Sequence, residues 1–379
     1  MEPTSVASGD TLIRAVDNKI SDVRTQSLDF SFNELADMYA AGELIIEPDF
    51  QRMFRWTEGA QARFIESLLL ELPVPPIFLI EREDRIYELI DGLQRISSFL
   101  HFRGQLTIDG DLLPPLYLAE CDIVPELNGL SYTDLPRSLE IKLKRSYIRA
   151  EILRKESDPR LRYYMFKRLN TGGEQLSEQE VRNATIRLLS NSFNEFIIEL
   201  SRLPEFVTSI GTVNENQIRR KFDQELVLRF FAFKNAVTLY RHEIADFLTD
   251  YMEAVSDPEA DISFDYDRER QVFEKTFKVF HALGTRLGIG ARIFGTVTKA
   301  GEPRSQFSVY HYEGLVLGLQ PVLDRIDLDN VDQMSRLADV VKTGKADVEF
   351  LKHTGGGKND RISLAARVRY FADRFGGVV

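Results

Sequence analysis

The sequence predicts an α+β protein, with a small mixed sheet in the N-terminal half and a mostly helical C-terminal half. Short apolar runs that end at turns occur in the first half, as at residues 44–46 and 147–153. Beyond about Asn191 the apolar residues recur at helical spacing instead. A chain of 379 residues has room for two domains of ordinary size. We therefore predict an N-terminal extension over residues 1–28, an α+β domain over 29–190 and a helical domain over 191–379.

The composition indicates a soluble globular protein and excludes several other classes. A hydrophobic content of 43% with 28% charged residues is ordinary for folded domains. The longest apolar region, from Phe64 to Ile80, is interrupted by glutamates and prolines, so no membrane span is expected. Residues 1–17 lack the basic-then-apolar pattern of a secretory signal. Cys121 is the only cysteine, which excludes an internal disulfide and a thiolate metal cluster. A cytoplasmic location is therefore expected.

The charge is uneven along the chain. The formal net charge of −11 argues against a protein that simply coats nucleic acid. From Arg137 to Arg187, however, 13 Lys and Arg stand against 7 Asp and Glu, a local charge of +6 that leaves −17 for the rest. This segment forms either solvated helix faces or a basic pocket for a phosphate-bearing ligand. The acidic stretch from Ser256 to Asp267 is predicted to be a surface loop or linker.

Capping residues predict where several helices begin. Ser31 with Glu34, and Ser177 with Glu180, have the S-x-x-E spacing of a capping box. Thr57 precedes a stretch with helical spacing of its apolar residues and is a third candidate cap. These three positions predict helix starts at about residues 32, 58 and 178.

The remaining elements follow from apolar periodicity and turn residues. Strands are predicted over residues 77–81 and 86–90, and a helix follows Asp91-Gly92. Another helix is expected from Asp158-Pro159 to Leu169. In the C-terminal half, long helices are predicted over residues 193–203, 215–237, 268–283, 314–326, 331–341 and 361–375.

The segment Asp91-Gly92-Leu93-Gln94-Arg95 lies where a predicted strand passes into a predicted helix. Free backbone N–H groups and the positive end of the helix dipole suit an anionic phosphate at such a place. Gly92 permits close backbone approach, Arg95 can donate two hydrogen bonds to phosphate oxygens, and Asp91 can hold a divalent cation or orient water. The alternative is an ordinary Asp-Gly turn with Arg95 at the surface.

Two other segments also place Gln or Asn beside Arg. Gln51-Arg52 precedes Arg55-Trp56, whose tryptophan is alternatively a core residue. Asn170-Thr171-Gly172-Gly173 ends a predicted helix just after Lys167-Arg168, and its alternative is an ordinary glycine C-cap. This loop nevertheless offers backbone amides to an anion. Three such segments together favour a ligand site over three unrelated turns.

Taken in order, the three segments resemble the N-terminal domain of the GmrSD-type modification-dependent restriction enzymes, a ParB/sulfiredoxin-like domain. The hallmarks of that family are a Q-R-x-x-x-W segment, a D-G-Q-Q-R-like segment and an F-x-R-x-N-x-G-G segment. Here they stand as QRMFRW from Gln51, DGLQR from Asp91 and FKRLNTGG from Phe166. Residues 220–230 also look like the helical continuation of the family, so the resemblance spans roughly residues 29–233. It implies a ParB/sulfiredoxin-like fold for the N-terminal half.

The resemblance further implies a site that binds and hydrolyses a nucleoside triphosphate, with Mg²⁺ as the expected cation. In the family this activity gates action on foreign or modified DNA. The catalytic residues carried over are Asp91, Gln94 and Arg95, with Asp91 as the candidate metal ligand. The nucleotide-binding residues carried over are Gln51, Arg52, Gly92, Arg95, Arg168, Asn170, Gly172 and Gly173. The chain departs from the family at Leu93, where a polar residue is usual, which would weaken catalysis if that side chain met the ligand.

A second departure concerns the nuclease. Family members often end in a His-Asn-His nuclease domain, but the five histidines here show neither paired ligand spacing nor an asparagine–histidine box. Each is expected to be a partly exposed or core histidine. The glycine-rich segment from His353 to Asn359 also fails the spacing of a phosphate-binding loop. Any nuclease must therefore be a partner protein or the ParB-like domain itself.

Three functions follow from these observations. The first is a nucleoside triphosphatase in restriction or phage defence, in which Arg52 and Arg95 neutralise the phosphates while Asp91 and Mg²⁺ position a water. The second is a non-catalytic, nucleotide-switched module whose helical half binds DNA or a partner. The third is a ParB-like DNA nickase, against which the net charge of −11 counts. The expected partners are the nucleotide, DNA, a separate nuclease or defence protein and further copies of the chain, with no membrane.

Overall fold

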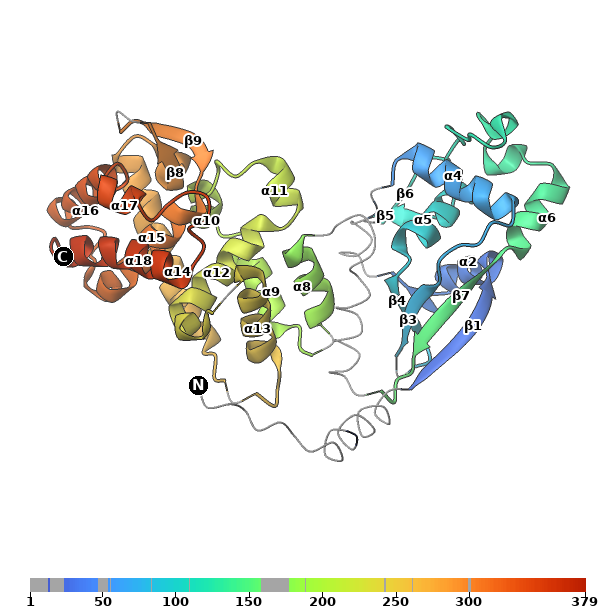
Figure 1. Ribbon diagram of the computed structural model, residues 1–379, viewed down its shortest axis with the longest axis horizontal. Coiled ribbons are helices and arrows are strands. Elements are labelled where there is room, and N and C mark those ends of the chain that lie inside the picture. Colours follow the sequence, from blue (N-terminus) through green and yellow to red (C-terminus); the bar gives the residue numbers. More distant parts are fainter. Residues whose placement is uncertain are drawn as a thin grey trace. The chain divides into compact units, whose positions relative to one another are not determined.

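The computed structural model describes residues 13, 24–46, 54, 56–82, 84–108, 110–157, 177–187, 189–241, 243–260, 262–298 and 301–379. The chain divides into two compact units, residues 1–173 and residues 174–379 (Figure 1). The first unit combines a sheet with helices and the second is mostly helical, which confirms the predicted fold class. None of the helices within the described ranges is both long enough and apolar enough to cross a membrane.

The N-terminal unit is built on a mixed sheet with the strand order β1-β7-β3-β4-β2. The strands are β1 (Thr25–Ser31), β2 (Leu44–Ile45), β3 (Ile77–Glu81), β4 (Tyr87–Asp91) and β7 (Tyr147–Leu153). β3 runs antiparallel to β4 and parallel to β7, and its register pairs Ile77 with Ala150 and Phe78 with Asp91. One end of the sheet, which we call the sheet edge, therefore holds the start of β3, the end of β4 and the start of β7.

Four helices pack on one another in the N-terminal unit, namely α2 (Phe32–Ala40), α4 (Glu58–Leu69), α5 (Leu93–Phe102) and α6 (Arg137–Arg145). The predicted caps of α2 and α4 are confirmed, because the Ser31 and Thr57 side chains each accept a hydrogen bond from a first-turn backbone N–H. Phe32 and Phe99 are buried between these helices with their ring centroids 4.9 Å apart. Between α5 and α6 lie β5 (Thr107–Ile108), β6 (Asp111–Leu112), η1 (Pro125–Leu127) and η2 (Tyr132–Asp134).

The C-terminal unit consists of helices around an aromatic core, with one small hairpin. Phe230, Phe231, Phe273 and Phe277 are all buried there in ring contact with one another. The helices are α8 (Glu178–Ile186), α9 (Ser192–Leu200), α10 (Pro204–Ser209), α11 (Glu215–Arg219), α12 (Phe222–Ala236), α13 (Ile244–Ser256), α14 (Tyr266–Arg286), α15 (Val309–Leu319), α16 (Val331–Gly344), α17 (Val348–Leu351) and α18 (Arg361–Gly376), and the hairpin pairs β8 (Gly295–Val297) with β9 (Pro303–Phe307).

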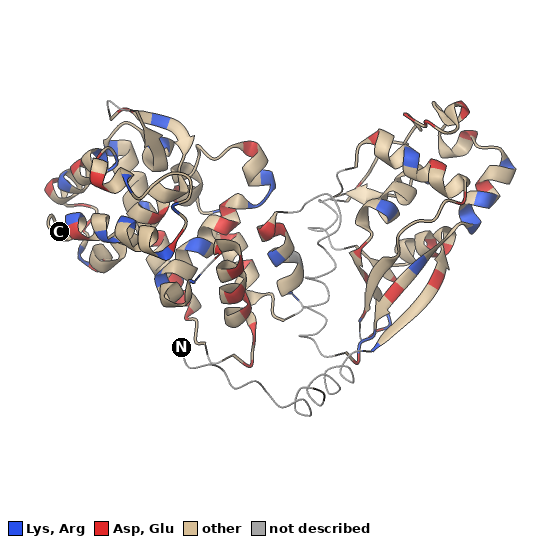
Figure 2. Ribbon diagram, viewed as in Figure 1, with Lys and Arg blue, Asp and Glu red and all other residues tan. Residues whose placement is uncertain are grey.

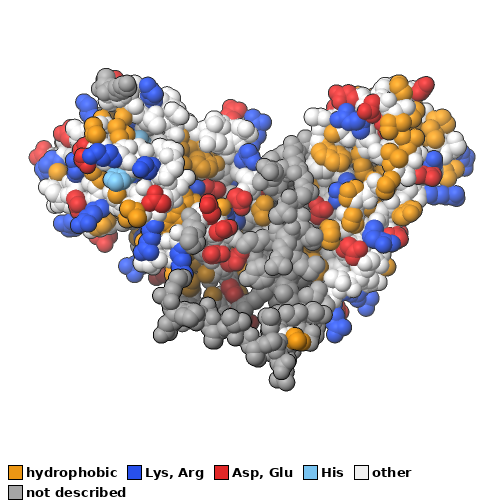
Figure 3. Space-filling view, viewed as in Figure 1, with side chains coloured by type: hydrophobic (Ala, Val, Ile, Leu, Met, Phe, Trp, Pro, Cys, Tyr) orange, Lys and Arg blue, Asp and Glu red, His pale blue; other side chains and the backbone are white. Residues whose placement is uncertain are grey.

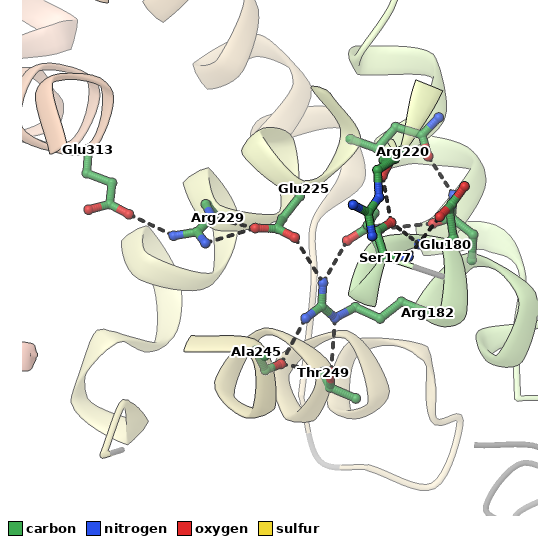
Figure 4. Close-up of polar contacts among 12 residues, drawn as sticks. Ser177, Glu180, Arg182, Arg220, Glu225, Arg229, Ala245, Thr249 and Glu313 are labelled. Atoms are coloured by element: carbon green, nitrogen blue, oxygen red, sulfur yellow. Dashed lines mark hydrogen bonds and ion pairs between the residues drawn. The ribbon is translucent and has the colours of Figure 1, made fainter. Parts of the chain in front are cut away.

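A chain of alternating charges runs through the interior of this second unit (Figure 4). Arg182 of α8 meets Glu225 of α12 at 3.6 Å, and Arg229 lies 2.8 Å from Glu225 and 3.0 Å from Glu313 of α15. Arg367 of α18 then approaches Glu313 at 2.7 Å. Four helices that are distant in the sequence are thus tied together by charge-assisted hydrogen bonds and ion pairs in the interior.

The single helix predicted over residues 215–237 is wrong. Lys221 adopts a left-handed conformation, with φ of 62°, and separates α11 from α12. The hydroxyl of Ser177 donates a 2.6 Å hydrogen bond to the carbonyl oxygen of Arg220 at this break. Apolar spacing continues across the break, so periodicity could not reveal it. The helix predicted over residues 314–326 also ends early, because α15 gives way to the 3₁₀ segment η5 (Gln320–Arg325), which contains Pro321 near its start.

The unit boundaries also differ from those expected from composition. The capping box of Ser177 and Glu180 opens α8 as predicted, but α8 packs against α12 and α13 of the helical unit, ahead of the expected boundary at residue 190. At the other end, β1 begins at Thr25 inside the segment expected to be an extension, and it pairs with β7 along its whole length.

Candidate functional site

The candidate site is the turn at which β4 becomes α5. Gly92 occupies it with φ of 106° and ψ of 10°, a conformation that side chains disfavour. A Cβ atom at this position would lie 2.3 Å from Cγ2 of Ile77, at the start of the adjacent strand β3. Only glycine therefore fits, for a conformational and a steric reason together. The sharp turn brings the first residues of α5 directly next to the sheet edge.

The N-terminus of α5 has no side-chain cap, because glycine supplies none. The first-turn N–H groups of a helix lack intrahelical acceptors, and together with the helix dipole they attract anions. The turn thus has the backbone geometry expected of a phosphate site.

Arg95 is held at the base of the turn. Its Nη2 donates to Oδ2 of Asp91 at 2.9 Å and to the carbonyl oxygen of Pro76 at 3.0 Å. The Arg95 and Asp91 side chains are 15% and 29% exposed, so the pair is partly buried yet reachable from solvent. The buried Nε of Arg95 has no hydrogen-bond partner within the described part of the chain. Such a guanidinium retains donors for an incoming anion.

Gln94 joins the first motif to the second. Its Oε1 accepts a 3.0 Å hydrogen bond from the backbone N–H of Trp56. The Trp56 carbonyl accepts in turn from Nε2 of Gln61, at 2.9 Å. The Trp56 ring lies edge-on against Phe64, with centroids 5.7 Å apart. Two segments that are 38 residues apart in sequence are therefore in direct contact, and Gln94 acts as a positioning group in this arrangement.

Gln61, which bonds to Trp56, also belongs to a buried hydrogen-bond network that the sequence did not indicate. Oε1 of Gln61 lies 2.8 Å from Nδ1 of His101, and Nε2 of His101 lies 2.9 Å from the carbonyl oxygen of Pro114. Phe54 also packs edge-on against the His101 ring. His101 is thus a core histidine that supports the segment carrying the first motif, in line with its expected role.

The first and third motifs lie largely outside the described residues. This applies to Gln51 and Arg52, and equally to Arg168, Asn170, Gly172 and Gly173. Trp56, however, is described, and its backbone N–H bonds to Gln94. The meeting of all three motifs at one ligand stays a prediction.

Leu93 is buried, with 5% of its surface exposed. The departure from the family pattern at this position therefore places an apolar side chain in the core of the unit, and the side chains left at the surface of the turn are Asp91, Gln94 and Arg95.

Metal binding at the turn would rest on Asp91. One carboxylate together with substrate phosphates is a common way for proteins to hold Mg²⁺. The partly exposed carboxylate of Asp91 at a strand end fits that pattern. Within the ranges that the structure describes, no three His, Cys, Asp or Glu side chains group as a metal site.

The comparisons with known proteins bear on this same part of the chain. Residues 32–187 match the family model described as the GmrSD restriction endonuclease, N-terminal domain. The matched range includes the β4–α5 turn, Trp56 and all of α8, but it covers less than half of the chain. No curated protein and no solved structure matches the sequence. The resemblance predicted from the three motifs is thus confirmed, and residues 32–187 resemble the N-terminal domain of the GmrSD restriction endonucleases.

Proposed function

We propose that this protein binds a nucleoside triphosphate at the β4–α5 turn and hydrolyses it, as part of restriction or anti-phage defence against foreign or modified DNA in the cytoplasm. The resemblance of residues 32–187 to the GmrSD N-terminal domain supports the restriction or defence role. The observation that supports nucleotide binding is the geometry of the turn itself. It combines a glycine that admits no side chain, an uncapped helix N-terminus and the adjacent pair of Asp91 and Arg95.

Each residue of the turn has a distinct role in this proposal. The N–H groups at the start of α5 and the guanidinium of Arg95 receive the phosphates, which accept the forked hydrogen bonds that arginine donates. An incoming phosphate competes with Asp91 for Arg95, so binding leaves the Asp91 carboxylate available to orient a water. Mg²⁺ held by Asp91 would neutralise phosphate charge as it does in other phosphoryl-transfer sites. Gln94 accepts a hydrogen bond from the backbone N–H of Trp56, and Gln51 and Arg52 of the same motif are proposed to add phosphate contacts.

The FKRLNTGG segment completes the proposed pocket, with Arg168, Asn170, Gly172 and Gly173 adding a cation, an amide and two glycine N–H groups. DNA and a separate nuclease or defence protein are the proposed downstream partners.

Phosphate release from each common nucleoside triphosphate, measured with and without MgCl₂, tests the proposal. Turnover is expected to fall about tenfold or more in Asp91→Ala and in Arg95→Ala, since each removes a charge from the reacting centre. Asp84→Ala is the matched control, because Asp84 is an exposed aspartate at the opposite end of the same β3–β4 hairpin. Equal turnover in all four proteins would refute the proposal.

Two further measurements separate the alternatives. Tight nucleotide binding without phosphate release would select a nucleotide-switched module. Nicking of a supercoiled plasmid that depends on Asp91 would select a nuclease.

A further inference from the structure

A groove lies in the N-terminal unit, and the proposed nucleotide chemistry does not use its charged residues. It is a half-open groove of about 930 Å³ at the sheet edge. The end of α4, the Pro73–Pro76 segment, one face of α6 and the start of β7 line it, together with Asp29 of β1. We call this site the α6 groove. Prolines fix the backbone of one wall, so the shape of that wall varies little.

The cations of the α6 groove come from a basic part of an acidic chain. Residues 137–149 carry five Lys and Arg against one Glu, whereas the net charge of the whole chain is −11 (Figure 2). Lys142 pairs with Glu71 at 3.2 Å, and Arg149 pairs with Asp29 at 3.0 Å. Both pairs are solvent-exposed and therefore exchange easily for other partners. The exposed guanidinium of Arg145 has no carboxylate partner among the described residues.

Large apolar side chains stand exposed between these charges. Leu72 is 43% exposed, Ile141 38% and Tyr147 68%. The space-filling view shows hydrophobic and basic side chains reaching the surface of this unit together (Figure 3). Clustered apolar side chains with a polar rim mark interaction surfaces, and Tyr and Arg are enriched at the centres of protein interfaces.

The backbone at the groove wall is strained in a way that favours a role for Glu71. The N–H of Leu72 bonds to the carbonyl of Ser67 at 2.9 Å, and that of Glu71 bonds to Leu68 at 3.2 Å, which ends α4 in a Schellman motif. Glycine is the usual residue at the left-handed position, yet Glu71 occupies it with φ of 58°. Backbone of this kind recurs at functional sites, although Lys221 adopts it at the break between α11 and α12. Here it presents a carboxylate to Lys142 inside the groove.

We infer that the α6 groove binds a short segment of a partner protein in which one or more carboxylates flank a large apolar side chain. Arg145 receives a carboxylate, and the apolar side chain packs between Leu72, Ile141 and Tyr147. Glu71 and Asp29 already pair with Lys142 and Arg149, which leaves Arg145 as the cation without a carboxylate partner among the described residues. A peptide with one or two carboxylates therefore fits the groove better than a nucleic-acid strand with a charge at every phosphate. The binding residues of this inference are separate from the β4–α5 turn, although Pro76, whose carbonyl holds Arg95, also lines the groove.

Selection of a random-peptide phage library on the immobilised full-length chain tests the inference. Enriched peptides are expected to carry Asp or Glu next to large apolar residues. A synthetic peptide of the enriched sequence, followed by fluorescence anisotropy, should bind Arg145→Glu and Ile141→Asp about tenfold more weakly, as for loss of a charge-assisted contact or of a buried anchor. Lys144→Glu is the matched control, since Lys144 lies on the same helix but does not line the groove. Its affinity should stay close to that of the wild type.

Thermal unfolding must show that all three variants fold. The inference is overturned if no peptide is enriched, or if the enriched peptide binds Arg145→Glu as tightly as it binds the wild type. It is also overturned if Arg145→Glu abolishes binding of a short DNA duplex while no peptide depends on this residue.

Discussion

The charged groups of the candidate sites in the N-terminal unit and those of the charge chain in the helical unit differ in how far solvent reaches them. In the N-terminal unit, carboxylates and cations meet at the sheet edge and in the α6 groove, where solvent reaches them. In the helical unit they form a chain through the interior, in which Glu313 and Arg367 are each only 1% exposed. Exposed pairs contribute little to stability and can change partners, whereas each buried charge needs its partner to offset desolvation. The first arrangement suits binding, and the second fixes one packing of the helices.

The directions of the pKa shifts reflect this difference. Burial tends to raise the pKa of Glu225, but the charges of Arg229 and Arg182 outweigh it and hold the pKa below its ordinary value. For Asp29, by contrast, a hydrogen bond from the exposed Arg149 is the main cause of a lowered pKa. Burial is therefore the largest single influence on the pKa of Glu225, although the two arginines overcome it. For Asp29 burial has less effect on the pKa than the hydrogen bond from Arg149.

The largest change in stability is expected from breaking the buried chain of charges in the helical unit. Glu313→Gln removes the charge that Arg229 and Arg367 share, and we expect the free energy of unfolding to fall by about 3–5 kcal/mol in urea denaturation. The double variant Glu313→Leu with Arg367→Met should recover part of this loss, because it removes Arg367 together with its partner while Arg229 keeps Glu225. If Glu313→Gln were as stable as the wild type, the buried ion pairs of Glu313 would not stabilise the helical unit.

The next effect concerns the turn of the N-terminal unit. Gly92→Ala places a methyl group against Ile77 in a conformation that alanine disfavours, and should lower the free energy of unfolding by about 3 kcal/mol. Gly104→Ala is a useful control, since Gly104 also has a positive φ of 68° but meets no atom within 4 Å of an added Cβ. Equal losses in the two variants would mean that only the backbone conformation matters and that contact with Ile77 does not.

A smaller effect is expected from Lys345, a buried lysine that donates to the carbonyl oxygens of Arg292 and Ile293. Burial, and next the charge of Arg292, lower its pKa from 10.5 to about 7. Between pH 7 and 10.5 the unfolded chain therefore binds more protons at Lys345 than the folded chain does, so the free energy of unfolding should rise with pH over this range. Below about pH 7 Lys345 is charged in both states, and the full cost of burying its charge lowers the stability. His311 beside it stays neutral, because burial lowers its pKa to about 3.

Urea denaturation at several pH values between about 7 and 9 measures this slope, which should approach roughly 1 kcal/mol per pH unit. Lys345→Met should remove the slope. A wild-type protein whose stability is flat over this range would contradict the assigned direction of the shift.

The smallest effect is expected from the exposed pair of Asp29 and Arg149. Asp29→Asn breaks a two-pronged contact between neighbouring strands, yet the melting temperature should change scarcely at all, because solvent screens both groups. A loss comparable to that of Glu313→Gln would erase the distinction between the two units.

Local features of the fold could be predicted from the sequence, while features that depend on distant partners could not. The caps at Ser31, Thr57 and Ser177 were predictable because each acts within three residues of itself. Strand β1 was missed, because its largely exposed sequence TQSLDFS gains its partner only in β7, where Arg149 contacts Asp29 across 120 residues of sequence. The left-handed Lys221 leaves no pattern in the sequence and was missed for that reason.

The same division applies to the candidate site. The strand-to-helix turn with Gly92 was predictable from its local sequence, and so was the cluster of polar residues around it. The hydrogen bond from Trp56 to Gln94, and the contact of Arg95 with the Pro76 carbonyl, join segments distant in sequence, and the motifs alone did not define them. The buried charges of α8, α12, α15 and α18 carry no motif at all, since their role depends on which helices become neighbours.

The central claim, that the β4–α5 turn holds a triphosphate, is tested most directly by calorimetric titration of a non-hydrolysable nucleoside triphosphate with Mg²⁺ into the full-length chain. One binding event per chain is expected, and it should weaken about tenfold or more in Arg95→Ala and stay unchanged in Asp84→Ala. Absence of binding to the wild type, or equal affinity in Arg95→Ala, would contradict it.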